Sequence, residues 1–111
     1  MEYLYHCVYI SGGGNEINGG IFELKETPKT IIFKQKIKSF FNCNYETIKA
    51  KKETEHEVDG YKVYTGYGDV IKFKDKEYII YPQKCGTPHI LTRITEQELQ
   101  KYKIKHWHEK N

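Results

Sequence analysis

The chain has 111 residues, of which 38% are hydrophobic and 14% aromatic, and it carries a formal net charge of +3. That length allows one domain, residues 1–111, and the aromatic content indicates a folded globule rather than a disordered chain. The sequence contains no apolar run of the roughly 18 residues that a membrane-spanning helix needs. Three scattered cysteines, Cys7, Cys43 and Cys85, favour free thiols in a reducing cytoplasm over a disulfide framework.

The first third of the chain has the alternating pattern of β-strands. Residues 1–10 place Cys7 and three tyrosines on one face and mainly aliphatic residues on the other, which predicts a central strand. The Gly-rich stretch 11–20 is predicted to form a flexible loop, with short strands following at 21–25 and 30–34. We therefore expect an antiparallel meander in this part of the chain.

The pattern changes after residue 35. Apolar side chains then fall at helical spacing, so a short helix is predicted over residues 36–44. Residues 46–57 are rich in Lys and Glu, which is typical of a strand at the exposed edge of a sheet, because charge there discourages aggregation.

Two β-hairpins between residues 58 and 81 are the clearest local feature. Asp59-Gly60 is typical of a type I′ turn, and the second hairpin turns at Asp75-Lys76. The expected cross-strand pairs are Val58–Tyr61, His56–Val63 and Thr54–Thr65 in the first hairpin, and Lys74–Glu77, Phe73–Tyr78 and Ile71–Ile80 in the second. This register gives the second hairpin one apolar face and one face rich in lysine.

The last part of the chain predicts a strand and a helix. After a loop over 82–88, a strand is expected at 89–94. Thr95 and Glu98 have the spacing of a capping box, so a helix is predicted from there to Lys103, with Leu99 and Tyr102 facing the sheet. The whole pattern predicts a small α+β domain dominated by an antiparallel β-sheet with one or two short helices.

Residue types used in phosphate, metal and thiol chemistry are present but poorly arranged. The Gly-rich stretch lacks the lysine and following helix of a phosphate-binding loop. His6 and Cys7 alternate on a strand and so point to opposite faces, and Cys85 and His89 lack a second, matching pair of metal ligands. We therefore predict no metal, cofactor or catalytic residue. A thiol- or metal-dependent hydrolase centred on Cys85 and His89 stays open, ranked third after the two binding functions given below.

Tyrosines interleaved with lysines across the two hairpins, together with the polar Gly-rich loop, are the candidate binding residues. They are Tyr61, Tyr64, Tyr67, Lys62, Lys72, Lys74, Gly13 and Asn15. Tyrosine supplies rigid amphipathic area at protein interfaces, and it also stacks on bases while lysine neutralises phosphate. Against nucleic acid, several Asp and Glu residues lie close by in sequence, and Arg93 is the only arginine.

The leading hypothesis is a small, non-enzymatic protein-binding module. The abundance of Lys, Ile, Asn and Tyr over Ala and Arg is typical of an AT-rich genome. A phage- or mobile-element-encoded inhibitor that blocks a surface of a larger host protein or nucleoprotein complex fits this composition. The alternative is a single-stranded nucleic-acid binder without sequence preference, and an exposed sheet edge would also allow a homodimer.

Overall fold

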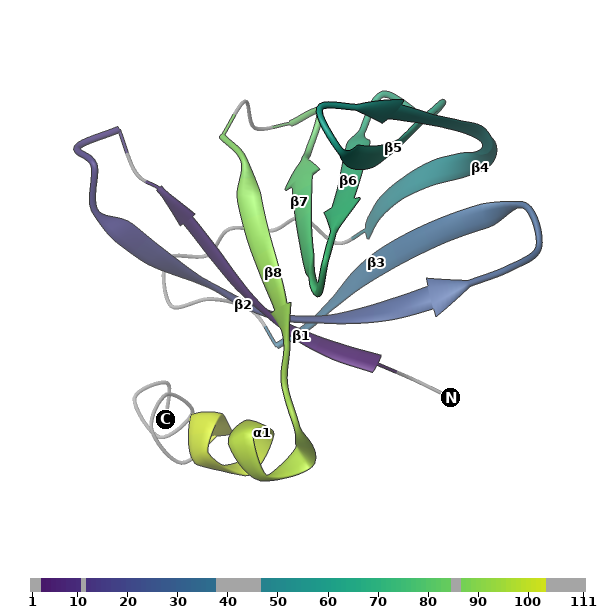
Figure 1. Cartoon of the computed structure of the whole chain (residues 1–111). Coiled ribbons are helices and arrows are strands. Elements are labelled where there is room, and N and C mark those ends of the chain that lie inside the picture. Colours follow the sequence, from purple (N-terminus) through teal and green to yellow (C-terminus); the bar gives the residue numbers. More distant parts are fainter. Residues whose placement is uncertain (1–2, 11, 38–46, 85–86, 104–111) are drawn as a thin grey trace.

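The protein is a closed antiparallel β-barrel with one short helix beside it in the part that the structure describes (Figure 1). The structure, a computed structural model, describes residues 3–10, 12–37, 47–84 and 87–103. Its elements are β1 (Tyr3–Ile10), β2 (Glu16–Glu26), β3 (Thr30–Ile37), β4 (Thr47–Val58), β5 (Tyr61–Thr65), β6 (Val70–Lys74), β7 (Glu77–Tyr81), β8 (His89–Arg93) and α1 (Glu96–Tyr102).

The predicted fold class, an α+β domain built on an antiparallel sheet, is therefore wrong. Each strand pairs with its neighbours in sequence, and β8 pairs with β1 to close the ring, with Cys7 opposite Leu91. Closure gives every one of the described strands a partner on both sides. The exposed edge predicted at residues 46–57 is wrong for the same reason, because β4 pairs with both β3 and β5.

The Gly-rich stretch is shorter as a loop than the sequence predicts. β2 already begins at Glu16, and Gly19 is the extra residue where the register of β1 and β2 shifts between Cys7 and Val8. A Cβ at Gly19 would come within 2.6 Å of the Cys7 Sγ, so glycine is required for this close approach. The prediction of a flexible loop is thus wrong for residues 16–20.

β3 extends to Ile37, which contradicts the start of the helix predicted over 36–44. Phe33 is buried, and Gln35 donates from Nε2 to the Gly19 carbonyl oxygen at 3.0 Å, so pairing with β2 continues past the predicted end of the strand. The rest of the predicted helix, residues 38–44, lies outside the described residues.

The two predicted hairpins are confirmed in every pair but one. Lys51, rather than Thr54, lies opposite Thr65, because the register of β4 and β5 shifts between Lys51 and His56. The Thr54 hydroxyl bridges this irregularity, since its Oγ1 accepts from the Thr65 N–H at 2.7 Å and donates to the Lys51 carbonyl oxygen at 2.6 Å. Asp59 and Asp75 both take positive φ in the turns, at 51° and 57°.

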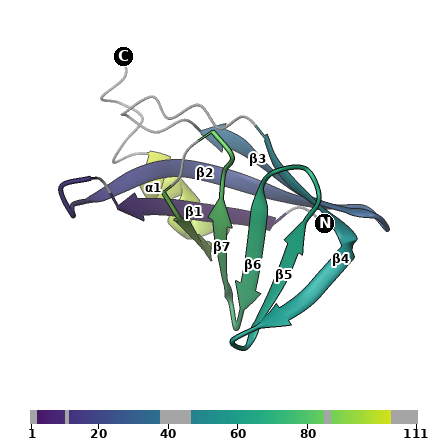
Figure 2. The ribbon, with the colours of Figure 1, turned by 90° about the horizontal axis from the view of Figure 1, so that it is seen from above.

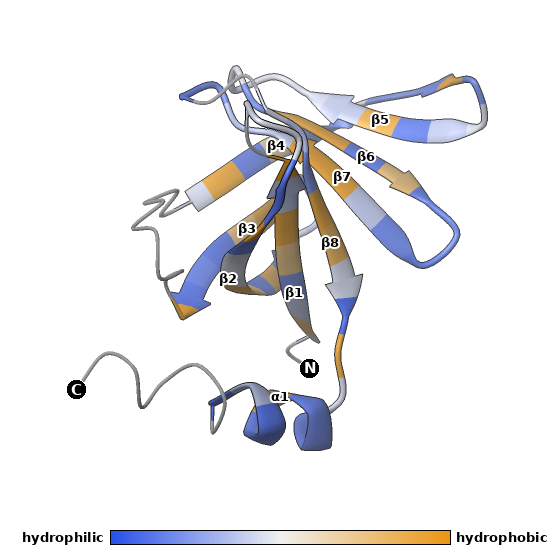
Figure 3. Ribbon diagram, turned by 90° about the vertical axis from the view of Figure 1, so that its left-hand side faces the viewer, coloured by the Kyte–Doolittle hydropathy of each residue, from blue (hydrophilic) through white to orange (hydrophobic). Residues whose placement is uncertain are grey.

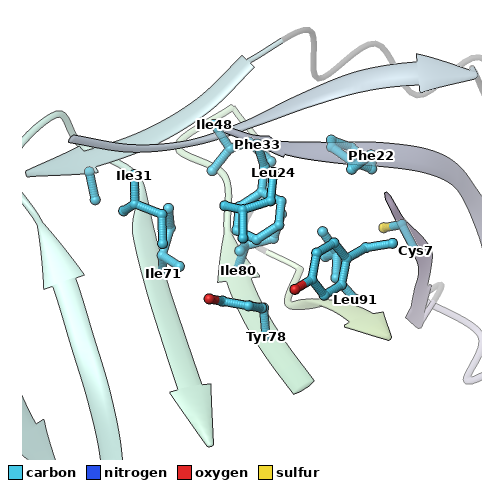
Figure 4. Packing of buried hydrophobic residues seen from close by; sticks show 12 residues of the cluster. Cys7, Phe22, Leu24, Ile31, Phe33, Ile48, Ile71, Tyr78, Ile80 and Leu91 are labelled. Carbon is cyan, nitrogen blue, oxygen red and sulfur yellow. The ribbon is translucent and has the colours of Figure 1, made fainter. Parts of the chain in front are cut away.

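The inside of the barrel is filled by side chains (Figure 4). Hydrophobic and hydrophilic residues alternate along most strands, which sends one set inward (Figure 3). The Tyr78 ring packs against Tyr5 and Phe33 with centroids 5.5 and 4.9 Å away. An eight-stranded barrel has an interior just wide enough for such side chains. Binding surfaces must therefore be sought on the outer wall.

The predicted C-terminal helix is confirmed as α1. The Thr95 hydroxyl accepts from the Glu98 N–H, and the Glu98 carboxylate accepts from the Thr95 N–H, which completes the capping box. Leu99 is buried, and the Tyr102 hydroxyl donates to Asn18 Oδ1 on β2 at 3.0 Å. Within the described residues, no helix has the length and apolar character to cross a membrane.

Candidate functional site

The barrel separates the tyrosines and lysines that the sequence groups together. Tyr64 lies opposite Ile71 and Lys62 lies opposite Phe73, so both are on the inner side of β5. Tyr64 packs against the core and donates its hydroxyl to Glu55 Oε1 at 2.7 Å. Burial and this carboxylate raise the pKa of Tyr64 to about 12. Tyr64 and Lys62 therefore do not share a surface with the other candidates.

Tyr61, Lys72 and Lys74 lie on the outer side of the barrel together with Tyr81, which the sequence did not single out. We call these four residues the outer array. The Lys72 Nζ lies 6.0 Å from the Tyr61 ring centroid and 5.1 Å from that of Tyr81, and the Lys74 Nζ lies 5.0 Å from Tyr61. Such distances allow cation–π attraction, which holds both the rings and the ammonium groups on the outer wall.

Tyr67 belongs to a second group, the Tyr67 cluster, which consists of Tyr67, Lys49 and Lys51. Both lysines point outward from β4 because Ile48 and Ala50 occupy the alternate, inward positions. Their Nζ atoms lie 4.7 and 5.4 Å from the Tyr67 ring centroid. Tyr67 is 42% exposed, so much of this side chain stays open to solvent beside two positive charges.

Two glycines let the β5–β6 turn bring Tyr67 close to β4. Gly66 and Gly68 have φ values of 113° and 91°, which other residues rarely adopt. A Cβ at Gly66 would lie 2.9 Å from the Lys51 Cγ, and one at Gly68 would collide with the Gln83 side chain. The turn is therefore packed against its neighbours on both sides of Tyr67.

Asp69 fixes the same turn by hydrogen bonds. Its Oδ2 accepts from the Lys49 N–H at 3.2 Å, and its Oδ1 accepts from the Gln83 N–H at 2.8 Å. These bonds join the turn to β4 on one side and to the segment after β7 on the other. Tyr67 is thus an exposed aromatic side chain on an anchored backbone, which is a preorganised arrangement.

An open hollow of about 530 Å³ lies beside this ring, between the β2–β3 turn and β4. We call it the Tyr67 hollow; its lining residues are Pro28, Lys29, Thr30, Lys51, Lys52, Glu53 and Tyr67. One backbone hydrogen bond, from the Lys52 N–H to the Lys29 carbonyl oxygen at 2.9 Å, joins its two sides.

The acidic residues that counted against nucleic acid are divided between the two sides of the sheet. Glu55 accepts the hydroxyl of Tyr64, and Glu57 lies opposite Lys62, so both are turned away from the outer array. Glu53 lines the Tyr67 hollow and Glu77 lies opposite Lys74, so these two remain near the lysines. Asp69 also stays near the lysines, because its carboxylate accepts from the Lys49 N–H, so the outer wall of β4–β7 carries acidic as well as basic groups.

Gly13 and Asn15 do not belong to this surface. They lie in the β1–β2 turn, which projects away from β5 and β6 in both Figure 1 and Figure 2. Gly14 between them takes a φ of 84°, and nothing lies within 4 Å of where its Cβ would be. The structure therefore does not bring the Gly-rich turn together with the tyrosines.

His89 is fully buried inside the barrel, where its ring stacks on Tyr9 with a centroid distance of 4.6 Å. Its Nδ1–H donates to the Thr87 carbonyl oxygen at 2.7 Å, and burial lowers the pKa of the imidazole. Cys85 lies outside the described residues, so the geometry of a Cys85–His89 pair stays a prediction.

The side chains of Cys7 and His6 lie on opposite sides of the barrel wall. The Cys7 side chain is buried on the inner side, whereas His6 lies on the outer side within 3.3 Å of Asn18 Oδ1, so the predicted opposite faces are confirmed. In the described ranges, no three or more His, Cys, Asp or Glu side chains are grouped as metal ligands would be.

An apolar stripe crosses the outer wall next to the outer array, because Ile79 on β7 lies opposite Lys72. Val8, Ile90 and Ile79 lie side by side on β1, β8 and β7, and Ile10 follows Val8 on the same side of β1. Ile90 and Ile10 are 36% and 40% exposed. The sequence missed this stripe because β1 becomes a neighbour of β8 only when the barrel closes.

No family model, curated protein or solved structure matches this chain. Function must therefore be inferred from the side chains that the barrel presents. Two surfaces stand out among them: the Lys- and Tyr-containing wall of β4–β7, and the apolar stripe on β1, β8 and β7.

Proposed function

We propose that the protein is a non-enzymatic, cytoplasmic binding module that holds single-stranded nucleic acid on its outer wall without sequence preference. The observation that supports this proposal is the pairing of outward-facing lysines with tyrosine rings in the Tyr67 cluster and the outer array. Aromatic rings stack on any base, and lysines beside them neutralise the phosphates that join the bases.

The two groups are close enough to contact one strand. Lys51 lies opposite Thr65, continuing the β5–β6 register places Thr65 beside Val70, and Val70 lies opposite Tyr81. Neighbouring strands are about 4.8 Å apart, so this row of four residues spans at most about 14 Å. A strand of several nucleotides covers that distance, in keeping with sites of about 4–16 nucleotides in other small barrels.

The choice of basic residues supports binding without base reading. Lysine meets phosphate as a point charge, whereas bidentate recognition of a base edge normally uses arginine. Arg93, the only arginine, has its guanidinium carbon 3.9 Å from the Tyr3 ring centroid, and it belongs to neither the outer array nor the Tyr67 cluster. The wall of β4–β7 thus relies on charge and stacking.

Fluorescence anisotropy of a labelled oligothymidylate across a salt series tests this proposal. We expect binding that weakens steeply as salt increases, because released counterions drive it. The double variant Lys49→Gln/Lys51→Gln should bind more weakly and lower the salt slope by about 1.4, since each phosphate contact on a single strand contributes about 0.7. Lys62→Gln, on the inner side of β5, is the matched control and should leave the slope unchanged. No binding even at low salt would exclude the proposal.

A protein partner is the second candidate, favoured by the apolar stripe rather than by the tyrosines. Ile10 and Ile90 are exposed beside the half-buried Val8 and Ile79, and neighbouring apolar side chains at the surface are typical of an area that another protein covers. The partner would be a larger host protein or nucleoprotein complex, as for an inhibitor encoded by a phage or another mobile element, or a second copy of this chain. In this case Ile90 and Ile10 carry the contact, and the lysines on β4–β7 do not.

A further inference from the structure

The Tyr67 hollow combines the features that a single nucleotide requires. It is lined by one exposed ring, one proline, one threonine, three lysines and one glutamate, and its volume falls within the range of about 300–1,000 Å³ that is usual for small-ligand sites. The backbone on both sides is fixed, by the hydrogen bonds of Asp69 in the same turn as Tyr67 and by the hydrogen bond from the Lys52 N–H to the Lys29 carbonyl oxygen.

The lysines of the hollow differ in how far their charges are already neutralised. Lys52 Nζ lies 2.8 Å from Glu26 Oε2, a close ion pair. Lys51 Nζ lies 3.9 Å from the exposed Glu53, a contact that solvent weakens. Lys29 forms no ion pair with any of the described residues. Lys29 and Lys51 are therefore the two cations left to bind an anion.

The β2–β3 turn fixes the backbone of Lys29, which lines the hollow. Thr27 Oγ1 accepts from the N–H groups of Lys29 and Thr30, at 3.3 and 2.9 Å. The Thr27 N–H also donates to the Thr30 carbonyl oxygen at 2.9 Å, which closes the turn. Pro28, with its fixed φ, forms the apolar wall of the hollow on this side.

We infer that the Tyr67 hollow is a subsite for one nucleotide of the bound strand, with the base on Tyr67 and Pro28 and the phosphate between Lys29 and Lys51. This inference rests on the proposed function. The ring and the proline give an apolar contact that any base satisfies, and the two lysines require a phosphate beside it. The subsite thus selects a phosphorylated nucleotide over a nucleoside.

Titration of the labelled protein with adenosine monophosphate and with adenosine, followed by amide NMR shifts, tests the subsite. Adenosine monophosphate should shift the amides of residues 29–30, 51–53 and 66–68, and adenosine should bind at least fivefold more weakly. Tyr67→Ala should abolish these shifts while Tyr67→Phe keeps them, because stacking needs the ring and not the hydroxyl. Lys29→Gln should weaken binding about twofold to fivefold, as expected for one exposed charge.

Equal affinity for the nucleoside and the nucleotide, or shifts confined to other residues, would overturn the subsite. The oligonucleotide assay separates this failure from failure of the proposed function. Oligonucleotide binding that Tyr67→Ala and Lys29→Gln leave unchanged would overturn the subsite alone. Mononucleotide binding without oligonucleotide binding would overturn the strand-binding proposal. Unchanged folding of each variant is checked by its amide spectrum.

Discussion

At the scale of single residues, His89 is a buried group whose ionisation the fold opposes. Its imidazole is fully buried, stacks on Tyr9 and donates from Nδ1 to the Thr87 carbonyl oxygen. That bond fixes the proton of the neutral ring on Nδ1. Because burial lowers its pKa, the folded protein binds this proton less readily than the unfolded chain does.

This difference predicts a loss of stability in mild acid. Above the unfolded pKa of about 6.5, His89 is neutral in both states and its effect does not change with pH. As the pH falls below that value the unfolded state takes up a proton first, so the free energy of unfolding drops by at most about 1.4 kcal/mol per pH unit. Urea unfolding at pH 7.5, 6.5 and 5.5 measures this slope. His89→Phe, which keeps a ring on Tyr9, should flatten it, and an unchanged slope in this variant would contradict the explanation.

The residue scale also shows what alternation along a strand can predict. The opposite faces of His6 and Cys7 follow directly from a period of two. The same rule separates Tyr61 from Tyr64, which the sequence analysis wrongly placed in one cluster. Tyr67 is different, because its contact with Lys49 depends on the conformation of a turn and on a strand about 20 residues away.

At the scale of elements, the residues in the turns predicted the pairing of the hairpin strands well. The glycine-rich composition, by contrast, predicted the length of β2 poorly. Asp59-Gly60 and Asp75-Lys76 set their hairpins through local backbone preferences, so their pairings were readable from sequence. β2 was read as a loop up to residue 20 because glycine normally marks flexibility. In the barrel Gly19 instead allows β2 to lie close to Cys7 on β1. This requirement can be seen only once the partner strand is known.

The contact between β1 and β2 at Gly19 gives a test at this scale. Gly19→Ala places a methyl group within 2.6 Å of the Cys7 Sγ, so the strands must separate or Cys7 must move. We expect a loss of about 1–3 kcal/mol in the free energy of unfolding, measured by urea titration.

Gly12→Ala is the matched control, because nothing lies within 4 Å of its Cβ position. Adding Cys7→Ala to Gly19→Ala should restore part of the stability, since it removes the sulfur from the contact. A Gly19→Ala protein as stable as the Gly12→Ala control would show that the two strands are less tightly packed here.

At the scale of the whole molecule, closure of the barrel is the feature that sequence reasoning could not supply. Nearly all strands were found, but whether they form a flat sheet or a ring depends on the pairing of β1 with β8. Tyr5 and Arg93 are paired although they lie near opposite ends of the described sequence. No local turn motif can predict a contact between residues so far apart in sequence. The fold class was therefore wrong although the hairpins were right.

The closed wall also gives a test of the second candidate function. If the apolar stripe binds a second copy of the chain, Ile90→Lys should convert a dimer into a monomer, because it places a charge among aliphatic side chains. Sedimentation equilibrium of the native protein and the variant measures this change. Thr92→Lys, also on the outer side of β8, is the control. A monomeric native protein would exclude self-association through the stripe and leave a different protein as its partner.

Joining β1 to β8 has a consequence for the order in which the protein acquires its structure on the ribosome. The first strand to be synthesised must wait for the last before its second side is paired. Until residue 93 has emerged, the growing chain exposes the free sides of β1 and β7, which are open to pairing with other chains. The interval between the first hairpin and the last strand is thus the period in which this protein is most vulnerable to aggregation.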